Sequence, residues 1–223
     1  MLEITFALVA YILGSIPNAI WVGNLFFGID VREHGSGNAG ATNVFRVLGK
    51  VPGTIVLILD ILKGYFAVRL ADVVDFLSRD GYSDLALSRN DLSGLAVGDH
   101  KLLMVLFGTM SVIGHLIPLF AKFKGGKGVA TAAGVLLGIE PVLGLATFAT
   151  WLIVAFFTRY SSLAALASAV FAPAYYFLGN QVVWLIDKQV LLATVVMSGI
   201  LVWRHQANIA KLMRGKESRI GKS

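Results

Sequence analysis

The sequence predicts an all-α integral membrane protein, a polytopic bundle of about seven transmembrane helices of which one is short. Of its 223 residues, 57% are hydrophobic and only 14% are charged, whereas about a quarter of a soluble domain is charged. The mean hydropathy is +0.76, and several uncharged runs are long enough to cross a bilayer. The length suits a single domain over residues 1–223. No Cys is present, which excludes disulfides and a thiolate nucleophile.

The first two spans follow from uncharged runs and from the positions of prolines. No charged residue lies between Glu3 and Asp30, and this run is longer than one span needs. Pro17 is expected to bend the helix. Pro52 suits the first turn of a second span, which we expect to end at about Asp72. These runs predict one bent and one straight helix.

The middle of the chain alternates charged and apolar segments. Residues 72–99 hold six acidic against two basic residues and are expected to form an extracytoplasmic loop, with a short surface helix at most. A third span is predicted over 102–121, followed by the basic, glycine-rich run Lys122–Gly128. The apolar run 129–139 is too short to cross fully, which predicts a short or tilted fourth helix.

Three further helices and the charge distribution predict the topology. Helices are expected over 141–158, 161–178 and 189–203, the last continuing beyond the membrane as Arg204–Lys211. Seven helices place the basic segments that follow the first, third and last helices on one side. The positive-inside rule makes that side cytoplasmic, with the N-terminus outside and the C-terminus cytoplasmic. The net charge of +6 then reflects orientation in a membrane and not nucleic-acid binding.

The polar run Arg32–Arg46 is the first candidate site. It combines hydroxyls at Ser36 and Thr42 with amides at Asn38 and Asn43, and arginines flank it. These groups suit an oxyanion, and the glycines among them let backbone N–H groups approach a ligand closely. The alternative is a flexible loop.

Two nucleotide-binding motifs are excluded by context or spacing. Residues 35–40 match GxGxxG, but a dinucleotide fold needs a strand before the glycines, and here a membrane helix precedes them. Lys124–Thr131 opens a helix with small residues and two lysines, which suits phosphate, yet its spacing is not that of a Walker A motif. The alternative is that Lys124 and Lys127 only anchor the topology.

Further candidates lie inside the spans and at the last helix. His115 is a functional candidate because it is an intramembrane histidine, although a packing role is the alternative. Asp60 and Lys63 are expected to form an ion pair facing the bundle interior, with a direct catalytic role as the alternative. His205 and Asn208 share a helix face, unless this segment is only a basic tail lying on anionic lipid.

These features predict an enzyme or carrier that handles a phosphorylated small molecule at the cytoplasmic interface, with a bundle suited to an acyl chain. No metal-ligand cluster is apparent in the sequence. The rival class is a transporter or scramblase of a phosphorylated or anionic lipid, which would require polar residues on both faces or an inverted repeat. A purely structural scaffold would leave the dense polar run without a purpose.

The chain resembles the bacterial acyl-phosphate:glycerol-3-phosphate acyltransferases over nearly its whole length. Six motifs carry the resemblance: Gly14–Pro17, Asp30–Arg46, Asp60–Gly64, Gly114–Pro118, Lys124–Thr131 and His205–Ile209. The resemblance implies a multi-pass inner-membrane enzyme that makes lysophosphatidic acid and phosphate from acyl phosphate and sn-glycerol 3-phosphate, without a metal cofactor. Membrane lipids surround such an enzyme, and a soluble enzyme that makes acyl phosphate is an implied partner. The acidic segment and the pair Asn18 and Ala19 depart from the family pattern.

The resemblance also implies roles for particular residues. Ser36, Arg46, His205 and Asn208 are the implied catalytic residues. The implied substrate-binding residues are Asn38, Thr42, Asn43, Lys124, Gly125, Gly126, Lys127, Gly128 and Glu217.

An acyl phosphate already has an activated carbonyl, so positioning and charge stabilisation are expected to suffice for direct attack by the glycerol hydroxyl. His205, held by Asn208, is one candidate base, and a substrate phosphate oxygen is the other. A covalent acyl-enzyme on Ser36 is the remaining alternative.

Overall fold

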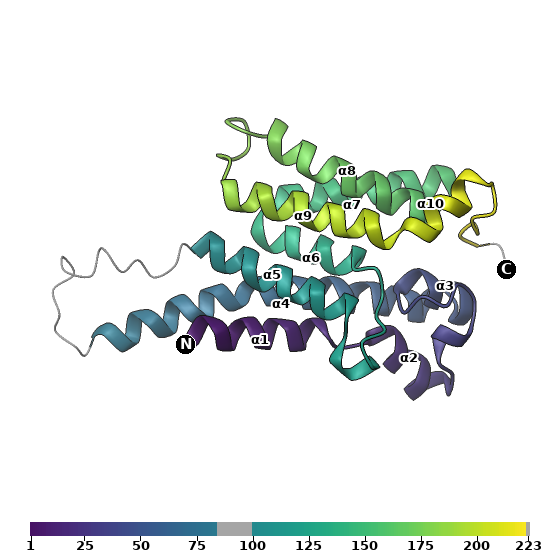
Figure 1. The fold of residues 1–223 in the computed structure, drawn as a ribbon, viewed down its shortest axis with the longest axis horizontal. Coiled ribbons are helices and arrows are strands. Elements are labelled where there is room, and N and C mark those ends of the chain that lie inside the picture. The colour runs from purple at the N-terminus through teal and green to yellow at the C-terminus, as the bar shows by residue number, and fades with distance from the viewer. Residues whose placement is uncertain (84–99, 222–223) are drawn as a thin grey trace.

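The computed structural model describes residues 1–83 and 100–221, and its regular elements there are helices (Figure 1). The α-helices are α1 (Leu2–Gly14), α2 (Asn18–Phe27), α3 (Ala41–Leu48), α4 (Lys50–Ser83), α5 (His100–Leu116), α6 (Val129–Ile139), α7 (Pro141–Thr158), α8 (Ser161–Leu178), α9 (Lys188–Arg204) and α10 (Gln206–Met213). Two 3₁₀ turns, η1 (Val31–Glu33) and η2 (Leu119–Ala121), complete the described elements.

The bundle is organised around the short helix α6. This helix packs against α4 and α5 on one side and against α7 on the other, with α1 outside α4 and α5 (Figure 1). Helix α8 packs between α7 and α9. Close approach of α6 to α4 depends on Gly134 and Gly64, where a Cβ would collide with the backbone of the facing helix. The two halves of the bundle thus meet at a helix of small residues.

Several helix boundaries follow from local chemistry. Pro141 begins α7 at a position where its missing N–H costs no hydrogen bond. The Asp187 side chain caps α9 by accepting from the amides of Gln189 and Val190. Gly28 ends α2 in the left-handed conformation that glycine adopts without strain.

The number and type of spans agree with the prediction. Four helices are long and apolar enough to cross a membrane singly, and the pairs α1–α2 and α9–α10 qualify as bent spans. With the short α6, these account for about seven helices, one of them short. The predicted bend near Pro17 is confirmed, because α1 and α2 meet at 43°.

The predicted end of the second span is wrong. Helix α4 continues to Ser83, so residues 72–83 are helical and the loop predicted from Asp72 does not begin there. Val74 is buried in the core, and Asp75 binds His100 at the start of α5 at 2.6 Å. Asp72 and Asp75 are thus partly exposed, on a helix whose other side packs against the core. The remainder of the predicted loop, residues 84–99, lies outside the described residues.

The last helix does not continue straight past Arg204. The pair α9–α10 bends by 58° at His205. The carbonyl of Leu201 accepts a hydrogen bond from the His205 imidazole Nδ1 at 2.7 Å, and the His205 backbone amide bonds instead to the carbonyl of Val202. A side chain that replaces a backbone donor in the helical ladder kinks a helix. His205 therefore makes its own bend.

Candidate functional site

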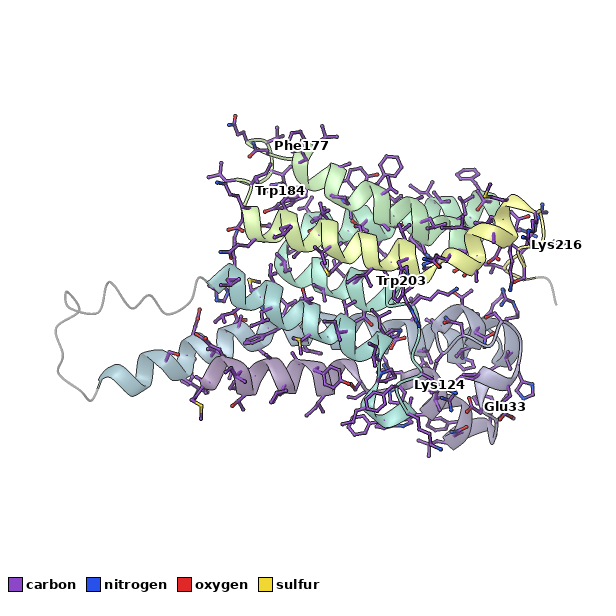
Figure 2. The ribbon with its side chains drawn as sticks, viewed as in Figure 1. Glu33, Lys124, Phe177, Trp184, Trp203 and Lys216 are labelled. Atoms are coloured by element: carbon purple, nitrogen blue, oxygen red, sulfur yellow. The ribbon has the colours of Figure 1, made fainter. Side chains whose placement is uncertain are left out.

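Three polar segments meet at one end of the bundle: Arg32–Arg46 (the first motif), Lys124–Thr131 (the second motif) and His205–Asn208 (the third motif). Figure 2 shows Glu33, Lys124 and Lys216 at this end, with Phe177 and Trp184 at the opposite end. The pairing of Arg69 with Asp72 and of Asp75 with His100, the first residue of α5, lies at that opposite end. The motif residues are therefore at the end of the bundle opposite to the acidic residues Asp72 and Asp75, as the sequence predicted. We call the end that holds the motifs the motif end.

Asn43 holds the loop of the first motif together. Its Oδ1 accepts from the backbone N–H of Ser36 at 2.7 Å and from the Ser36 hydroxyl at 3.1 Å. Its Nδ2 donates to the carbonyls of Val31 and His34. The loop passes this amide with Gly35 at φ +62°, where a Cβ would collide with Asn43 Oδ1. With all its polar atoms engaged, Asn43 positions Ser36 more than it contacts a ligand.

A cavity of about 360 Å³ opens at the motif end and extends between α6, α7, α8 and α9. This volume lies in the range of small-molecule sites. Its polar end is lined by ten of the residues that the sequence singled out: Ser36, Asn38, Thr42, Asn43, Arg46, Lys127, Gly128, His205, Asn208 and Glu217. Its deeper walls are mainly apolar and include Leu136, Met197 and a stacked pair of rings, Phe148 and Trp151. The cavity thus combines a polar head with an apolar stem.

Arg46 brings an uncompensated charge to the polar end. It lies in the last turn of α3, and its buried Nε has no hydrogen-bond partner among the described residues. The buried Nε of Arg204 is in the same condition, although Arg204 also donates to the carbonyl of Gly126 at 3.0 Å. Partly buried guanidinium groups that have no carboxylate partner among the described residues suit an anionic ligand.

Lys127 is fixed by a chain of polar contacts from the last helix and the C-terminal segment. Its Nζ donates to Asn208 Oδ1, and Asn208 Nδ2 donates to Glu217 Oε1 at 2.8 Å. Ser162, at the start of α8, donates to the same Glu217 oxygen at 2.8 Å. Burial lowers the pKa of the Lys127 ammonium from its usual value, and the Glu217 carboxylate acts in the opposite direction. This chain orients Lys127 beside the N-terminus of α6, where Gly128 also lines the cavity.

The first three residues of the second motif, Lys124, Gly125 and Gly126, do not line this cavity. Lys124 is exposed, and Gly125 and Gly126 pack against the end of α5. A Cβ at Gly126 would collide with the His115 ring and crowd the carbonyl of Ala39. The glycines therefore allow close packing that positions Lys127. A sequence shows that glycine is present but not whether a ligand or a neighbouring helix requires it.

His205 is 3% exposed and lines the cavity. Because a carbonyl only accepts, the bond from Nδ1 to Leu201 places a ring proton on Nδ1, so that in a neutral imidazole Nε2 is the acceptor. The predicted pairing with Asn208 is absent from the described contacts, where Asn208 binds Lys127 and Glu217 instead. His205 is thus oriented by its own helix.

Asp60 and Lys63 form the expected buried ion pair. Lys63 Nζ lies 2.9 Å from Asp60 Oδ1, and it also donates to the carbonyl of Ile16 between α1 and α2. Asn18 donates to the same Asp60 oxygen at 2.9 Å. His115 lies 3.7 Å from this oxygen and 3.2 Å from the Thr131 hydroxyl. Asp60 and His115 border the cavity, whereas Lys63 does not.

The sequence reasoning missed the contribution of α8 and of Arg204. Ser161 and Ser162 line the cavity, and the Ser161 hydroxyl lies 2.9 Å from that of Thr42. Both serines follow a turn that the predicted topology places on the same side as the motifs. That position was the sequence signal that could have identified them as site residues. No group of three or more His, Asp or Glu side chains suited to a metal ion is found among the residues the structure describes.

Comparison with known proteins supplies the family context of this site. The family model described as glycerol-3-phosphate acyltransferase matches residues 4–215. The glycerol-3-phosphate acyltransferase of Bordetella pertussis is 49% identical over 214 residues, covering 96% of this chain and 89% of the relative. That of Paraburkholderia xenovorans is 49% identical over 223 residues, covering 99% and 92%.

The solved structures agree with these relatives. The crystal structure of PlsY (YgiH), an integral membrane glycerol 3-phosphate acyltransferase, in its glycerol 3-phosphate form superposes with a TM-score of 0.78 at 34% identity. The match covers 98% of this chain and 96% of that one. Its lysophosphatidic acid form superposes with a TM-score of 0.76 at 33% identity, covering 98% and 95%.

Proposed function

The chain belongs to the glycerol-3-phosphate acyltransferase family, and from this premise we propose that acyl phosphate is its donor and lysophosphatidic acid its product. It is an integral membrane acyltransferase that acylates glycerol 3-phosphate. We place it in the inner membrane of a bacterium as a multi-pass protein, with the motif end facing the cytoplasm because basic side chains gather there. A soluble enzyme that makes acyl phosphate would supply the donor from that side.

The observation that carries this proposal is the shape of the cavity. A polar end with two arginines and two lysines suits two phosphate groups, and the apolar stem suits an acyl chain. An acyl phosphate has this same division, with a phosphate at one end and a hydrocarbon chain at the other. Lysophosphatidic acid, after which one of the two solved forms of PlsY is named, has it too.

In the proposed reaction the glycerol hydroxyl oxygen attacks the donor carbonyl, and the bond from that carbonyl to the phosphate oxygen breaks. Arg46, Lys127 and the N–H groups at the start of α6 hold the phosphates and stabilise the developing charge. The hydroxyl proton passes to His205 Nε2 or to a substrate phosphate oxygen. Ser36, with its hydroxyl directed to Asn43 at 3.1 Å, acts as a phosphate ligand and not as a nucleophile.

The direct test is turnover by the purified protein in detergent. Palmitoyl phosphate with glycerol 3-phosphate should release inorganic phosphate and form lysophosphatidic acid in equal amounts, and palmitoyl-CoA should give none. A folded protein that releases no phosphate above background would overturn the proposed donor. A trapped acyl adduct on Ser36 after rapid quench would overturn direct attack.

A variant of His205 separates the two proton acceptors. The side-chain amide of Gln in His205→Gln can donate to the Leu201 carbonyl in place of the ring N–H. The bend between α9 and α10 should therefore survive. If Nε2 is the base, turnover should fall by roughly 10²–10⁴-fold, measured at several pH values. A Gln variant near the wild-type rate would show instead that a substrate phosphate oxygen takes the proton.

A further inference from the structure

The apolar stem of the cavity ends at a packed floor. The deepest lining residues are Ala172 on α8, Thr147 on α7 and Thr194 on α9. One helical turn deeper on the same three helices lie Tyr176, Leu143 and Val190, each four residues from the lining residue of its helix. All three have 0% exposure. Tyr176 is held rigidly, since its ring stacks on Trp184 at 5.4 Å and its hydroxyl accepts from the Asp187 amide.

One wall of the stem is built from small residues. Helix α8 presents Ala165, Ala169 and Ala172 to the cavity in succession. The polar side chains nearby do not interrupt this wall, because the hydroxyl of Ser168 bonds back to the carbonyl of Ala164, within its own helix. The hydroxyl of Thr194 on α9 likewise bonds to the carbonyl of Val190. The stem therefore has width for a hydrocarbon chain and a definite end.

The depth of the stem corresponds to a chain of definite length. Ser161 at the polar end and Ala172 at the floor are eleven residues apart on α8, which is about 16 Å of helix. An extended chain of carbon–carbon single bonds advances about 1.25 Å per bond, so about thirteen bonds fit within this depth. A chain whose carbonyl lies at the polar end would bring its methyl group to the floor at roughly 14–16 carbons.

We propose that Ala172, backed by Tyr176, Leu143 and Val190, sets the acyl-chain length that the enzyme accepts. This inference rests on the proposed function and adds a specificity determinant to it. The carbon atoms of a longer chain would have to bend or leave the stem, because the floor side chains are packed and one is hydrogen-bonded. A larger side chain at Ala172, Ala169 or Ala165 would raise the floor in steps along α8.

The test is the ratio of turnover with palmitoyl phosphate to that with decanoyl phosphate. Ala172→Leu adds three carbons at the floor and should exclude about three methylenes, each worth roughly fourfold in binding. The ratio of kcat/KM values should therefore fall by roughly 60-fold at full exclusion and by at least tenfold, while decanoyl transfer persists. Ala174→Leu makes the same change on the other face of α8, outside the cavity, and should leave the ratio unchanged.

A graded series keeps the test decisive. The longest acyl chain that is accepted should be shorter in Ala169→Leu than in Ala172→Leu, and shorter again in Ala165→Leu. If one of these variants fails to fold, the other two still test this order. Equal ratios in the wild type and in all folded variants would overturn the proposal and indicate that the chain leaves sideways past Phe148 and Trp151. Absence of turnover with every donor in the wild type would instead contradict the proposed donor and so remove the premise of the inference.

Discussion

Replacing Arg46 by alanine should lower kcat/KM for glycerol 3-phosphate by about 10²–10³-fold without lowering stability. The guanidinium lines the polar end of the cavity, and its buried Nε has no partner among the described residues. Loss of a buried, charge-assisted contact to a ligand phosphate typically costs about 2–5 kcal/mol. The folded protein loses no ion pair in the substitution, because the described contacts give Arg46 none.

Two variants sharpen this prediction. Arg46→Lys keeps the charge but not the planar fork that binds phosphate through two hydrogen bonds, so it should recover only part of the activity. Arg214→Ala removes the same charge from an exposed position at the same end and should leave turnover unchanged. Steady-state kinetics with both substrates, beside thermal unfolding in detergent, makes the comparison. Near-wild-type kcat/KM in Arg46→Ala would contradict its assignment to the phosphate site.

The sequence predicted the helical class, the approximate spans and the convergence of the motifs. These depend on hydropathy and on whether an odd or even number of membrane crossings separates two motifs. It could not predict the bend at His205, which depends on one side chain competing for the carbonyl of Leu201. The extension of α4 beyond Asp72 was missed for a related reason. Acidic residues in a surface helix resemble a polar loop unless the buried positions between them, such as Val74, are recognised as a packed face.

The site was predicted better by residue type than by role. Asn43 and Asn38 resemble each other in sequence, yet Asn43 has every polar atom engaged in holding the loop. Lys124 and Lys127 lie three residues apart, but only Lys127 lines the cavity. These distinctions depend on contacts between distant segments, which local sequence patterns do not contain. The kinetic variants of Arg46 and His205 test the individual roles directly.

Removing one partner of the buried pair Asp60 and Lys63 should cost more stability than removing one partner of an exposed ion pair of the same spacing. Both side chains are almost fully buried, at 2% and 4% exposure, and they join α4 to the break between α1 and α2 through Asn18 and Ile16. Removing one partner leaves the other charge buried and uncompensated. Asp60→Ala should therefore lower the free energy of unfolding by about 3–5 kcal/mol, measured by denaturant titration in detergent.

Helix α4 contains its own control for this prediction. Arg69 and Asp72 form an i,i+3 pair at 2.5 Å, but their side chains are 40% and 42% exposed. Asp72→Ala should cost less than about 1 kcal/mol, because water solvates and screens the remaining charge. The double variant Asp60→Ala, Lys63→Met should be more stable than Asp60→Ala alone, since it buries no unpaired ammonium. Equal losses at the two aspartates, or no recovery in the double variant, would show that the buried pair is not what fixes α4 to the helix break. Such a result would mean that burial does not determine how much stability each of the two ion pairs loses when its aspartate is removed.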